Sequence, residues 1–363
     1  MKKLMPAENF MQRALFLARK GEGTVSPNPL VGAVIVKGKK VIAEGYHKKC
    51  GWPHAEIEAI RKAKPKDLKG ATLYINLEPC CHFGKTPPCV DEIIRRKFRK
   101  VIIAVKDPNP KVNGKSIKKL KQAGIKVSLG SGEKEALRLN EIFFKNMQQS
   151  LPFVVVKVAQ SLDGKIATAT GQSKWITSEK SRQVAKSLRD KYDAVLVGVN
   201  TIVKDNPSLK GLKRTPFKIV IDPNLRIPRQ TFVLKNHPEK LIVITSLSNK
   251  KKAQKISKAV KLIFLKKEKS GQFPIRSILK ALYHSGIMSV FVEGGAETIG
   301  RFFDAKAVDR VFIFIAPKII GGRNALASVG GKGVLSISSA ISLRDVKIEK
   351  IGSDFLISGK QII

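Results

Sequence analysis

The feature that constrains this chain most is a set of metal-binding side chains divided between two segments. The first segment reads HAE at residues 54–56, and the second reads PCCHFGKTPPC at residues 79–89. One imidazole (His54) and two thiols (Cys80 and Cys89) are ligands of the kinds that zinc prefers, and three protein ligands leave the fourth tetrahedral position for water. Any fold of the N-terminal part must therefore bring these two segments together.

Glu56 adds a proton carrier to this set. It follows His54 by two residues and can move protons without being a ligand, while bound zinc lowers the pKa of water toward neutrality. His-x-Glu followed later by Pro-Cys is typical of zinc deaminases. We therefore interpret His54, Cys80 and Cys89 as metal ligands and Glu56 as the catalytic acid and base.

Less specific interpretations exist for each of these residues taken singly. His54 alone would suit a helix cap or a core position, and the cysteines alone would suit buried apolar positions. A structural zinc site would need a fourth protein ligand, which Cys81 or His82 would supply. The spacing leaves both Cys80 and Cys81 open as the ligand, and we favour Cys80 because it directly follows Pro79.

Length and cysteine usage narrow the class of protein. A chain of 363 residues predicts two domains. Three of the four cysteines lie within residues 80–89, which indicates metal chemistry rather than a disulfide framework. No apolar run of signal length follows Lys2 and Lys3, and no stretch approaches 18 apolar residues. We therefore expect a cytoplasmic protein without a membrane partner.

The formal net charge of +41 is the one feature that favours a nucleic-acid partner, including an editing deaminase. The positive charges are mostly lysines spread along the chain, for example over residues 115–121 and 250–258. Aromatic residues make up only 6% of the chain, too few for an obvious base-stacking surface. We therefore attribute the positive charge to a lysine-rich proteome and to steering of phosphorylated substrates, and not to specific nucleic-acid binding.

Hydrophobic periodicity predicts two α/β units. In the first we expect helices over residues 7–20, 54–64, 88–97 and 133–149, and strands over 30–36, 40–46, 71–77 and 101–105. The metal ligands then fall at the starts of two helices, where the helix dipole favours thiolates and hydroxide. We place the boundary at the SLP sequence of residues 150–152, which gives domains of residues 1–149 and 150–363. In the second we expect strands over 153–158, 194–197, 218–221, 241–245, 261–265, 289–292, 310–315 and 354–358, and helices over 178–190, 250–260, 274–285 and 296–304.

Three segments of the second unit carry chemically suggestive residues. They read QSLDGKI at 160–166, SKWITS at 173–178 and EGGAETIG at 293–300. The last is a glycine-rich turn into a helix N-terminus, which can hold a phosphate through backbone N–H groups, although the Gly-x-Gly-x-x-Gly fingerprint is absent. Taken singly, the glycine pair suits a tight turn, Trp175 suits a core, and Ser173 or Thr177 suits a helix cap.

Taken together, these motifs resemble the bifunctional deaminase–reductase family of riboflavin biosynthesis. The matching segments are SPNPLVG (26–32), GYH (45–47), HAE (54–56), residues 77–89, DPNP (107–110), SLDGK (161–165), WIT (175–177) and EGG (293–295), in family order. The long gap between Cys80 and Cys89 separates this pattern from cytidine and tRNA adenosine deaminases, which use Pro-Cys-x-x-Cys.

The resemblance implies an α/β fold class with two domains. The N-terminal domain is expected to be a cytidine-deaminase-like α/β/α domain with zinc, and the C-terminal domain a dihydrofolate-reductase-like α/β domain that uses NADPH. The first would deaminate 2,5-diamino-6-(5-phosphoribosylamino)pyrimidin-4(3H)-one, and the second would reduce the ribosyl group to give 5-amino-6-(5-phosphoribitylamino)uracil. A homo-oligomer is also implied. A deaminase with a degenerate reductase domain and a nucleic-acid-editing deaminase are the alternatives.

The resemblance also implies binding residues in both domains. In the deaminase, those that would contact substrate are Asn28, His47, Lys85, Asp107 and Asn109. In the reductase, those that would contact substrate are Ser173, Arg189, Leu209 and Glu293. Those that would contact NADPH are Lys157, Ala159, Trp175, Thr201, Asp205 and Gly295.

The chain departs from the family pattern after the proposed NADPH residue Asp205. The family usually has DDPxLTxR, whereas residues 205–214 read DNPSLKGLKR, so that Leu212 stands where the phosphate-binding arginine belongs. Among the neighbouring cations Lys210, Lys213 and Arg214, we favour Arg214 because its fork can meet two phosphate oxygens at once. In the deaminase, Ser116 replaces a usual glycine and Cys81 a usual serine.

Overall fold

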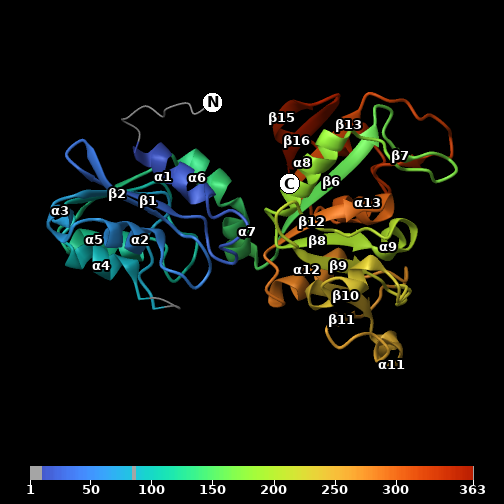
Figure 1. Ribbon diagram of the computed structural model, residues 1–363, viewed down its shortest axis with the longest axis horizontal. Helices are drawn as coiled ribbons and strands as arrows, with labels where there is room; N and C mark the ends of the chain where they lie inside the picture. The colour runs from blue at the N-terminus through green and yellow to red at the C-terminus, as the bar shows by residue number, and fades with distance from the viewer. Residues whose placement is uncertain (1–9, 84–86, 363) are drawn as a thin grey trace. The chain divides into compact units, whose positions relative to one another are not determined.

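The structure is a computed structural model that describes residues 10–83 and 87–362. The chain divides into two compact units, Met1–Ser150 and Leu151–Ile363 (Figure 1). Helix α7 ends at Gln149, and Ser150 takes a left-handed backbone conformation (φ 53°) before the first strand of the second unit begins at Phe153. The division therefore falls at the end of a helix.

The first unit is a five-stranded sheet covered by helices on both faces. The strand order is β2-β1-β3-β4-β5, with β1 antiparallel to both neighbours and β3, β4 and β5 mutually parallel. Its strands are β1 (Gly32–Lys37), β2 (Lys40–Tyr46), β3 (Thr72–Ile75), β4 (Lys100–Ile103) and β5 (Lys126–Leu129). Its helices are α1 (Phe10–Arg19), α2 (Ala55–Lys62), α3 (Pro65–Leu68), α4 (Cys89–Arg95), α5 (Lys115–Gln122), α6 (Glu133–Leu139) and α7 (Glu141–Gln149).

Strand β1 shows why both faces are covered. Its side chains alternate between two apolar clusters, because successive residues of a strand point to opposite faces. Ala33 and Ile35 pack with residues of α2, α4 and α5, whereas Val34 and Val36 pack with α1 and with Phe143 of α7. Figure 1 shows α1 and α6 along one side of the sheet and α2, α4 and α5 along the other. This confirms the expected α/β/α arrangement.

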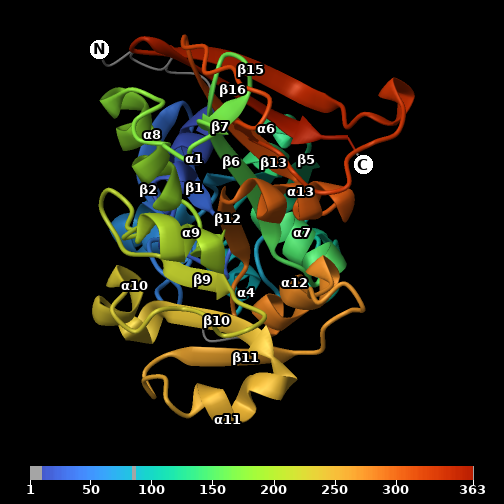
Figure 2. The same cartoon turned by 90° about the vertical axis from the view of Figure 1, so that its right-hand side faces the viewer.

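The second unit is built on a nine-stranded sheet in the order β11-β10-β9-β8-β12-β6-β13-β16-β15 (Figure 2). The strands from β11 to β13 are parallel, and β16 and β15 add an antiparallel edge. The strands are β6 (Phe153–Ser161), β8 (Ala194–Gly198), β9 (Phe217–Ile221), β10 (Leu241–Ser246), β11 (Lys261–Leu265), β12 (Ser289–Gly294), β13 (Arg310–Ala316), β15 (Leu343–Ile351) and β16 (Asp354–Gln361), with a small separate pair β7 (Lys165–Ala167) and β14 (Leu326–Ala327). The helices are α8 (Glu179–Arg189), α9 (Val199–Asp205), α10 (Phe232–Lys235), α11 (Lys250–Ala253), α12 (Ile275–His284) and α13 (Ala296–Asp304), with short 3₁₀ turns at Pro238–Lys240, Leu247–Asn249 and Ile337–Ser339.

Central strands of this sheet are apolar at consecutive positions because helices cover both faces. Strand β8 reads AVLVG and β12 reads SVFVEG, and both are buried over most of their length. The carboxyl ends of the parallel strands meet at one edge of the sheet, which is where open α/β sheets bind ligands. Glu293 and the Gly295 turn lie at the end of β12, and α9 follows β8, so these segments meet at that edge.

Several elements differ from the sequence-based prediction, and three of these differences have a physical explanation. The helix predicted over 133–149 is two helices that meet at Asn140. The Asn140 side chain accepts a hydrogen bond from the Leu30 N–H. The helix predicted over 250–260 ends at Ala253, and the Ser257 hydroxyl beyond it accepts a hydrogen bond from the Ala259 N–H in a local turn that competes with helix. The exposed strand β15 was not predicted, because it lacks a buried face that would produce a clear alternation.

Across residues 10–83 and 87–362, none of the helices combines the length and the apolar character that a bilayer crossing requires.

Candidate active sites

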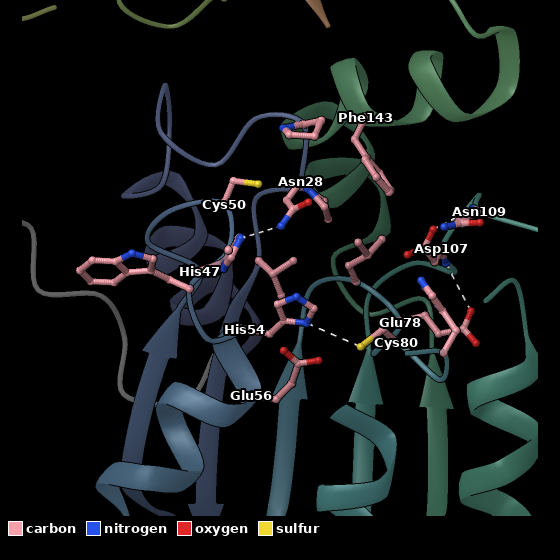
Figure 3. Close-up of a pocket in the computed structure, with 17 residues that line it drawn as sticks. Asn28, His47, Cys50, His54, Glu56, Glu78, Cys80, Asp107, Asn109 and Phe143 are labelled. Atoms are coloured by element: carbon pink, nitrogen blue, oxygen red, sulfur yellow. Dashed lines mark hydrogen bonds between the residues drawn. The ribbon is translucent and has the colours of Figure 1, made fainter. Parts of the chain in front are cut away.

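The first unit contains a cavity of about 250 Å³ at the ends of its central strands (Figure 3). The walls come from the loop before β1, from the residues after β2, β3 and β4, from the start of α2 and from α7. The lining residues are Pro27, Asn28, Pro29, Val31, His47, Cys50, Gly51, Trp52, His54, Glu56, Leu77, Glu78, Cys80, His82, Asp107, Asn109 and Phe143. Of the residues predicted for the deaminase, all except Cys89 and Lys85 line this cavity. Cys89 lies just behind the wall beside Cys80, and Lys85 lies outside the described residues.

The three predicted ligands converge on one point. His54 is the N-cap residue of α2, Cys89 begins α4, and Cys80 lies in the loop after β3. His54 Nδ1 lies 3.6 Å from Cys80 Sγ and 3.3 Å from Cys89 Sγ, and the ligand atoms of all three residues lie within 4.8 Å of one another. Cys81 Sγ instead donates to the Lys111 carbonyl at 3.5 Å. The structure thus brings Cys80, and not Cys81, to His54.

The donor chemistry of this group fits zinc. A hydrogen bond from the Cys89 thiol lowers the pKa of Cys80 to about 4, and the same hydrogen bond, together with burial, raises the pKa of Cys89. Two cysteine sulfurs this close together can both bind a divalent cation once they are deprotonated. The hydrogen bond to Cys80 raises the pKa of His54. Two sulfurs and one ring nitrogen at the wall of a cavity match a catalytic zinc site with one open position.

Glu56 lies beside these ligands with its carboxyl group on the floor of the cavity (Figure 3). The side chain is 2% exposed, and burial raises its pKa above the ordinary value for a glutamate. It belongs to the first turn of α2, one residue after the first helical position. A carboxyl group that holds its proton more firmly than usual, close to the ligands without being one, is suited to carry a proton during catalysis.

The predicted substrate residues line other parts of the cavity, and the His47 ring lies 5.3 Å from the ring of the ligand His54. Asn28 Nδ2 lies 3.0 Å from His47 Nε2, and His47 Nδ1 lies 3.1 Å from the Pro53 carbonyl. Burial lowers the pKa of His47, so the neutral ring donates to Pro53 and accepts from Asn28. Burial raises the pKa of Asp107 to about 7, and its Oδ1 accepts a hydrogen bond from the Asn109 N–H at 2.7 Å.

Sequence reasoning missed several lining residues. Glu78 stands within the family segment 77–89, but no spacing rule assigned it a task. Trp52, which precedes the HAE motif by two residues, and Phe143 on α7 add aromatic surface to the cavity wall. Their positions follow from how the loops and α7 pack, which periodicity does not reveal.

The second unit brings Arg189 and Glu293 together as a buried ion pair. Arg189 donates to Glu293 through Nη2 at 2.6 Å and through Nε at 2.5 Å, and its Nη1 donates to the Lys210 carbonyl at 2.7 Å. Burial raises the pKa of Glu293, but the charge of Arg189 outweighs it, so that the pKa lies below the ordinary value. Burial lowers the pKa of Lys157, whose charge also acts on Glu293. Three predicted reductase residues therefore share one charged cluster.

The predicted NADPH turn lies close to Thr201. Gly295 has φ 73°, and a Cβ at this residue would lie 3.7 Å from Thr201 Oγ1, while one at Gly294 would lie 2.9 Å from it. This close approach explains why the turn is built from glycine. Asp205, four residues after Thr201, is exposed at the end of α9.

The remaining predicted residues are more dispersed. Trp175 is 63% exposed and stacks under the Arg182 guanidinium at 4.3 Å, and half-buried Ser173 lies two residues before it. Ala159 is half-buried on β6, where it pairs in register with Phe314 of β13.

The loop of residues 209–214 is held by Asp190. Its carboxylate accepts the N–H groups of Leu212, Lys213 and Arg214 at 3.2, 2.9 and 3.1 Å. Leu209 is buried, Leu212 is 56% exposed, and Arg214 Nη2 donates to the Tyr192 carbonyl at 2.8 Å. Arg214 thus has one N–H group committed to the protein and others that this hydrogen bond does not use.

Comparisons with known proteins give a family model for each unit. Residues 5–105 match the family model described as the cytidine and deoxycytidylate deaminase zinc-binding region, and residues 152–357 match the RibD C-terminal domain. The two folds and the two sites define a bifunctional enzyme, in which a zinc-binding deaminase domain is joined to an NADPH-dependent reductase domain.

Relatives over the whole length give the family. The chain is 46% identical to the riboflavin biosynthesis protein RibD of Aquifex aeolicus over 98% of each chain, and 35% identical to that of Escherichia coli K12 over 96% of this chain and 98% of the other. A crystal structure from Thermotoga maritima, described as a diaminohydroxyphosphoribosylaminopyrimidine deaminase/5-amino-6-(5-phosphoribosylamino)uracil reductase, matches with a TM-score of 0.87 and 39% identity over 98% of this chain and 99% of that chain. This chain therefore belongs to the RibD family of bifunctional deaminase–reductases of riboflavin biosynthesis. The resemblance, the fold class and the enzyme class predicted from the sequence are confirmed.

Proposed function

We propose that this chain catalyses two successive reactions on one phosphorylated pyrimidine. The first unit deaminates 2,5-diamino-6-(5-phosphoribosylamino)pyrimidin-4(3H)-one, and the second reduces the ribosyl group to give 5-amino-6-(5-phosphoribitylamino)uracil. The observation that carries the proposal is the convergence of His54, Cys80 and Cys89 beside Glu56 in a cavity, on a chain whose other unit matches the RibD C-terminal domain.

In the deaminase, His54, Cys80 and Cys89 would hold zinc, which would supply a water molecule of lowered pKa. Glu56 takes a proton from the attacking water and returns it to the departing ammonia, so that the amino group is exchanged for oxygen without net loss of protons. Its burial supports this task, because a raised pKa brings the carboxyl group closer to the pH at which it both takes and gives a proton.

The polar wall of the cavity orients the substrate. Asn28, His47, Asp107 and Asn109 present amide, imidazole and carboxyl groups to the space beside Glu56, and the resemblance assigns Lys85 to the same task. A site that hydrogen-bonds a ring holds it in the one orientation in which its amino group faces the attacking water.

In the reductase, NADPH supplies the hydride when it is bound. Lys157, Ala159, Trp175, Thr201, Asp205 and Gly295 are the proposed cofactor contacts. Ser173, Arg189, Leu209 and Glu293 are the proposed substrate contacts. The double hydrogen bond between Arg189 and Glu293 supports this assignment, because it fixes both side chains at the carboxyl edge of the sheet.

Arg214 is our proposed partner of the substrate phosphate, in place of the arginine that the family has at the position of Leu212. The exposure of Leu212 and the N–H groups of Arg214 not used by Tyr192 support this choice. If none of the cations of this loop holds the phosphate, Arg189 is the remaining candidate.

We further propose a cytoplasmic homo-oligomer of two separately folding domains, with no specific nucleic-acid partner. Cysteines that gather as metal ligands, and not as a disulfide framework, suit a reducing compartment. Strand β15 lies at the edge of the large sheet with Val346 and Ile348 exposed, and the preceding loop exposes Leu335 and Ile337. An exposed edge strand beside apolar side chains is suited to pairing with a second copy of the chain.

The test is to supply the diaminopyrimidinone phosphate, first alone and then with NADPH, and to identify the products by mass. We expect loss of ammonia with gain of water in the first incubation, and a further gain of two hydrogens in the second. A chain that deaminates but never oxidises NADPH would refute the second half of the proposal.

A further inference from the structure

Glu78 is a buried carboxylate that the reaction outlined above does not use. It follows β3, precedes the ligand Cys80 by two residues, and lines the cavity. Its side chain is 2% exposed, and its own backbone N–H donates to the Val105 carbonyl at 3.0 Å. A carboxylate is rarely this buried unless its oxygens have hydrogen-bond partners.

Those partners all belong to one segment, residues 107–117, which runs from the end of the β4 strand region into α5. Glu78 Oε2 accepts the N–H groups of Gly114 at 2.9 Å and Asp107 at 3.3 Å, and Oε1 accepts the N–H of Ile117 at 3.3 Å. The same segment carries Asp107 and Asn109, two of the proposed substrate contacts.

The hydrogen bonds to Gly114 and Ile117 cap helix α5 from outside. The N-cap residue of this helix is Gly114, which has no side chain to accept the first N–H groups, and no local side-chain cap is present. Helix N-termini leave such donors unpaired and favour negative charge. Glu78 therefore supplies, from a neighbouring loop, the side-chain oxygens that an N-cap residue usually offers to the first N–H groups of a helix.

Two further contacts join the ligand loop to the same segment. The Ser116 hydroxyl, which is fully buried, donates to the Pro79 carbonyl at 2.5 Å, and the Cys81 thiol donates to the Lys111 carbonyl at 3.5 Å. Residues 78, 79 and 81 are thus all tied to the 107–117 segment, on either side of the ligand Cys80.

We propose that Glu78 is a positioning residue of the deaminase: it fixes the 107–117 segment against the ligand loop, so that Asp107 and Asn109 face a substrate whose amino group lies at the metal. The inference rests on the proposed deamination of a phosphorylated pyrimidine. It assigns Glu78 to substrate binding through Asp107 and Asn109, and not to proton transfer.

The test is Glu78→Gln, which keeps the size of the side chain but points an NH₂ donor at backbone N–H donors. In the zinc-loaded full chain we expect faster amide hydrogen exchange over residues 107–117, with zinc still bound at about one per chain. The KM for the diaminopyrimidinone phosphate should rise about tenfold or more, as for the loss of a hydrogen bond to a charged group, while kcat changes far less. Glu92→Gln, at a half-buried residue of α4 that is paired with Arg95 and Arg96, is the matched control and should change neither quantity.

A second variant covers the case in which Glu78→Gln does not fold. Ser116→Ala removes only the hydroxyl tether to Pro79 and should raise the KM in the same direction by a smaller factor. If Glu78→Gln folds, unchanged hydrogen exchange and an unchanged KM would overturn the inference. If only Ser116→Ala folds, an unchanged KM in that variant would overturn it. A kcat lowered without a KM change would also overturn it. Absence of deamination by the wild-type chain would instead refute the proposed function. The hydrogen-exchange result would still test whether Glu78 fixes the 107–117 segment.

Discussion

Glu56 and Asp107 are both buried carboxyl groups of the deaminase cavity, but their surroundings differ. Glu56 lies beside the metal ligands, whereas Asp107 lies on the far wall, where its Oδ1 accepts the Asn109 N–H. Burial raises the pKa of both, to about 7 for Asp107. The two residues can therefore be tested by different measurements, turnover for the first and pH-dependent stability for the second.

For Glu56→Gln we expect zinc to remain at about one per chain and deamination to fall by several orders of magnitude, because the amide neither takes nor returns a proton. Metal analysis and product mass are the measurements, and NADPH oxidation with the deaminated intermediate should be unchanged. Glu58→Gln, two residues further along α2 in an ion pair with Lys48, is the matched control. Retained turnover in Glu56→Gln would remove Glu56 from its assigned role.

For Asp107→Asn we expect a gain in stability that depends on pH. Below about pH 4 the carboxyl group is protonated in both the folded and the unfolded chain, so the variant gains nothing. Between pH 4 and about 7 the unfolded chain releases the proton and the folded chain keeps it, so wild-type stability falls as the pH rises and the advantage of the amide grows. It should level off above pH 7, at no more than about 4 kcal/mol.

Denaturant unfolding of wild type and Asp107→Asn at pH 5 and pH 8 measures this difference. Asp91→Asn, an exposed residue paired with Lys119, should show no comparable gain at pH 8. The same Asp107→Asn variant should bind substrate less tightly, because stability gained at a binding site usually lowers function. A stability gain equal at both pH values would contradict the assigned pKa.

At the scale of elements, the break between α6 and α7 has a tertiary cause. Asn140 Oδ1 accepts the Leu30 N–H at 2.8 Å, and its Nδ2 donates to the Leu30 carbonyl at 2.9 Å. Asn76 Nδ2 donates to the same carbonyl at 2.9 Å. Two buried asparagines thus hold the loop that carries Asn28, and α7 then places Phe143 against the cavity.

Asn140→Ala should destabilise the first unit by about 1–3 kcal/mol, because the Leu30 N–H loses its partner in a buried place. Denaturant unfolding followed by a probe of that unit is the measurement. Gln148→Ala, on the exposed side of α7, is the control and should change stability by less than about 0.5 kcal/mol. A neutral effect of Asn140→Ala would mean that the helix break has another cause.

The sequence predicted the parts of the fold that local chemistry and hydrophobic alternation determine. The motif around His54 and Cys80 predicted which segments meet, because their chemistry requires it, and hydrophobic alternation predicted most strands of both sheets. The task of Glu78 and the break at Asn140 depend on hydrogen bonds to residues far along the chain, which no local pattern encodes. Strand β15 was not predicted because it has no buried face. The phosphate partner in the reductase could not be assigned by resemblance, because the chain departs from its family pattern there.

At the scale of the whole molecule, the proposed oligomer is tested by Ile348→Glu. Ile348 is 68% exposed on β15, so a charge there should cost a monomer little but should disrupt a contact between two copies. Light scattering coupled to size exclusion should give a multiple of the 40.0 kDa chain for wild type and a lower mass for the variant. Lys347→Glu, the next residue, separates loss of apolar contact from a change of net charge. A monomeric wild type would refute the proposal.

The charge of the molecule leads to a prediction about nucleic acid. Because the lysines are dispersed and not gathered into one site, duplex or single-stranded DNA should bind no tighter than about 10⁻⁴ to 10⁻⁶ M at physiological salt. A titration over several salt concentrations measures this affinity and its salt dependence. Nanomolar, sequence-selective RNA binding at that salt would favour the editing alternative.

The joining of two units at Ser150 also has a consequence for metabolic supply. Translation of one message delivers a deaminase and a reductase in equal numbers, whatever the level of expression. The steady concentration of the intermediate is then set by the two turnover numbers and not by gene dosage. Selection on the balance between the two steps must therefore act through the turnover of each unit, because a slow reductase cannot be offset by making more of it alone.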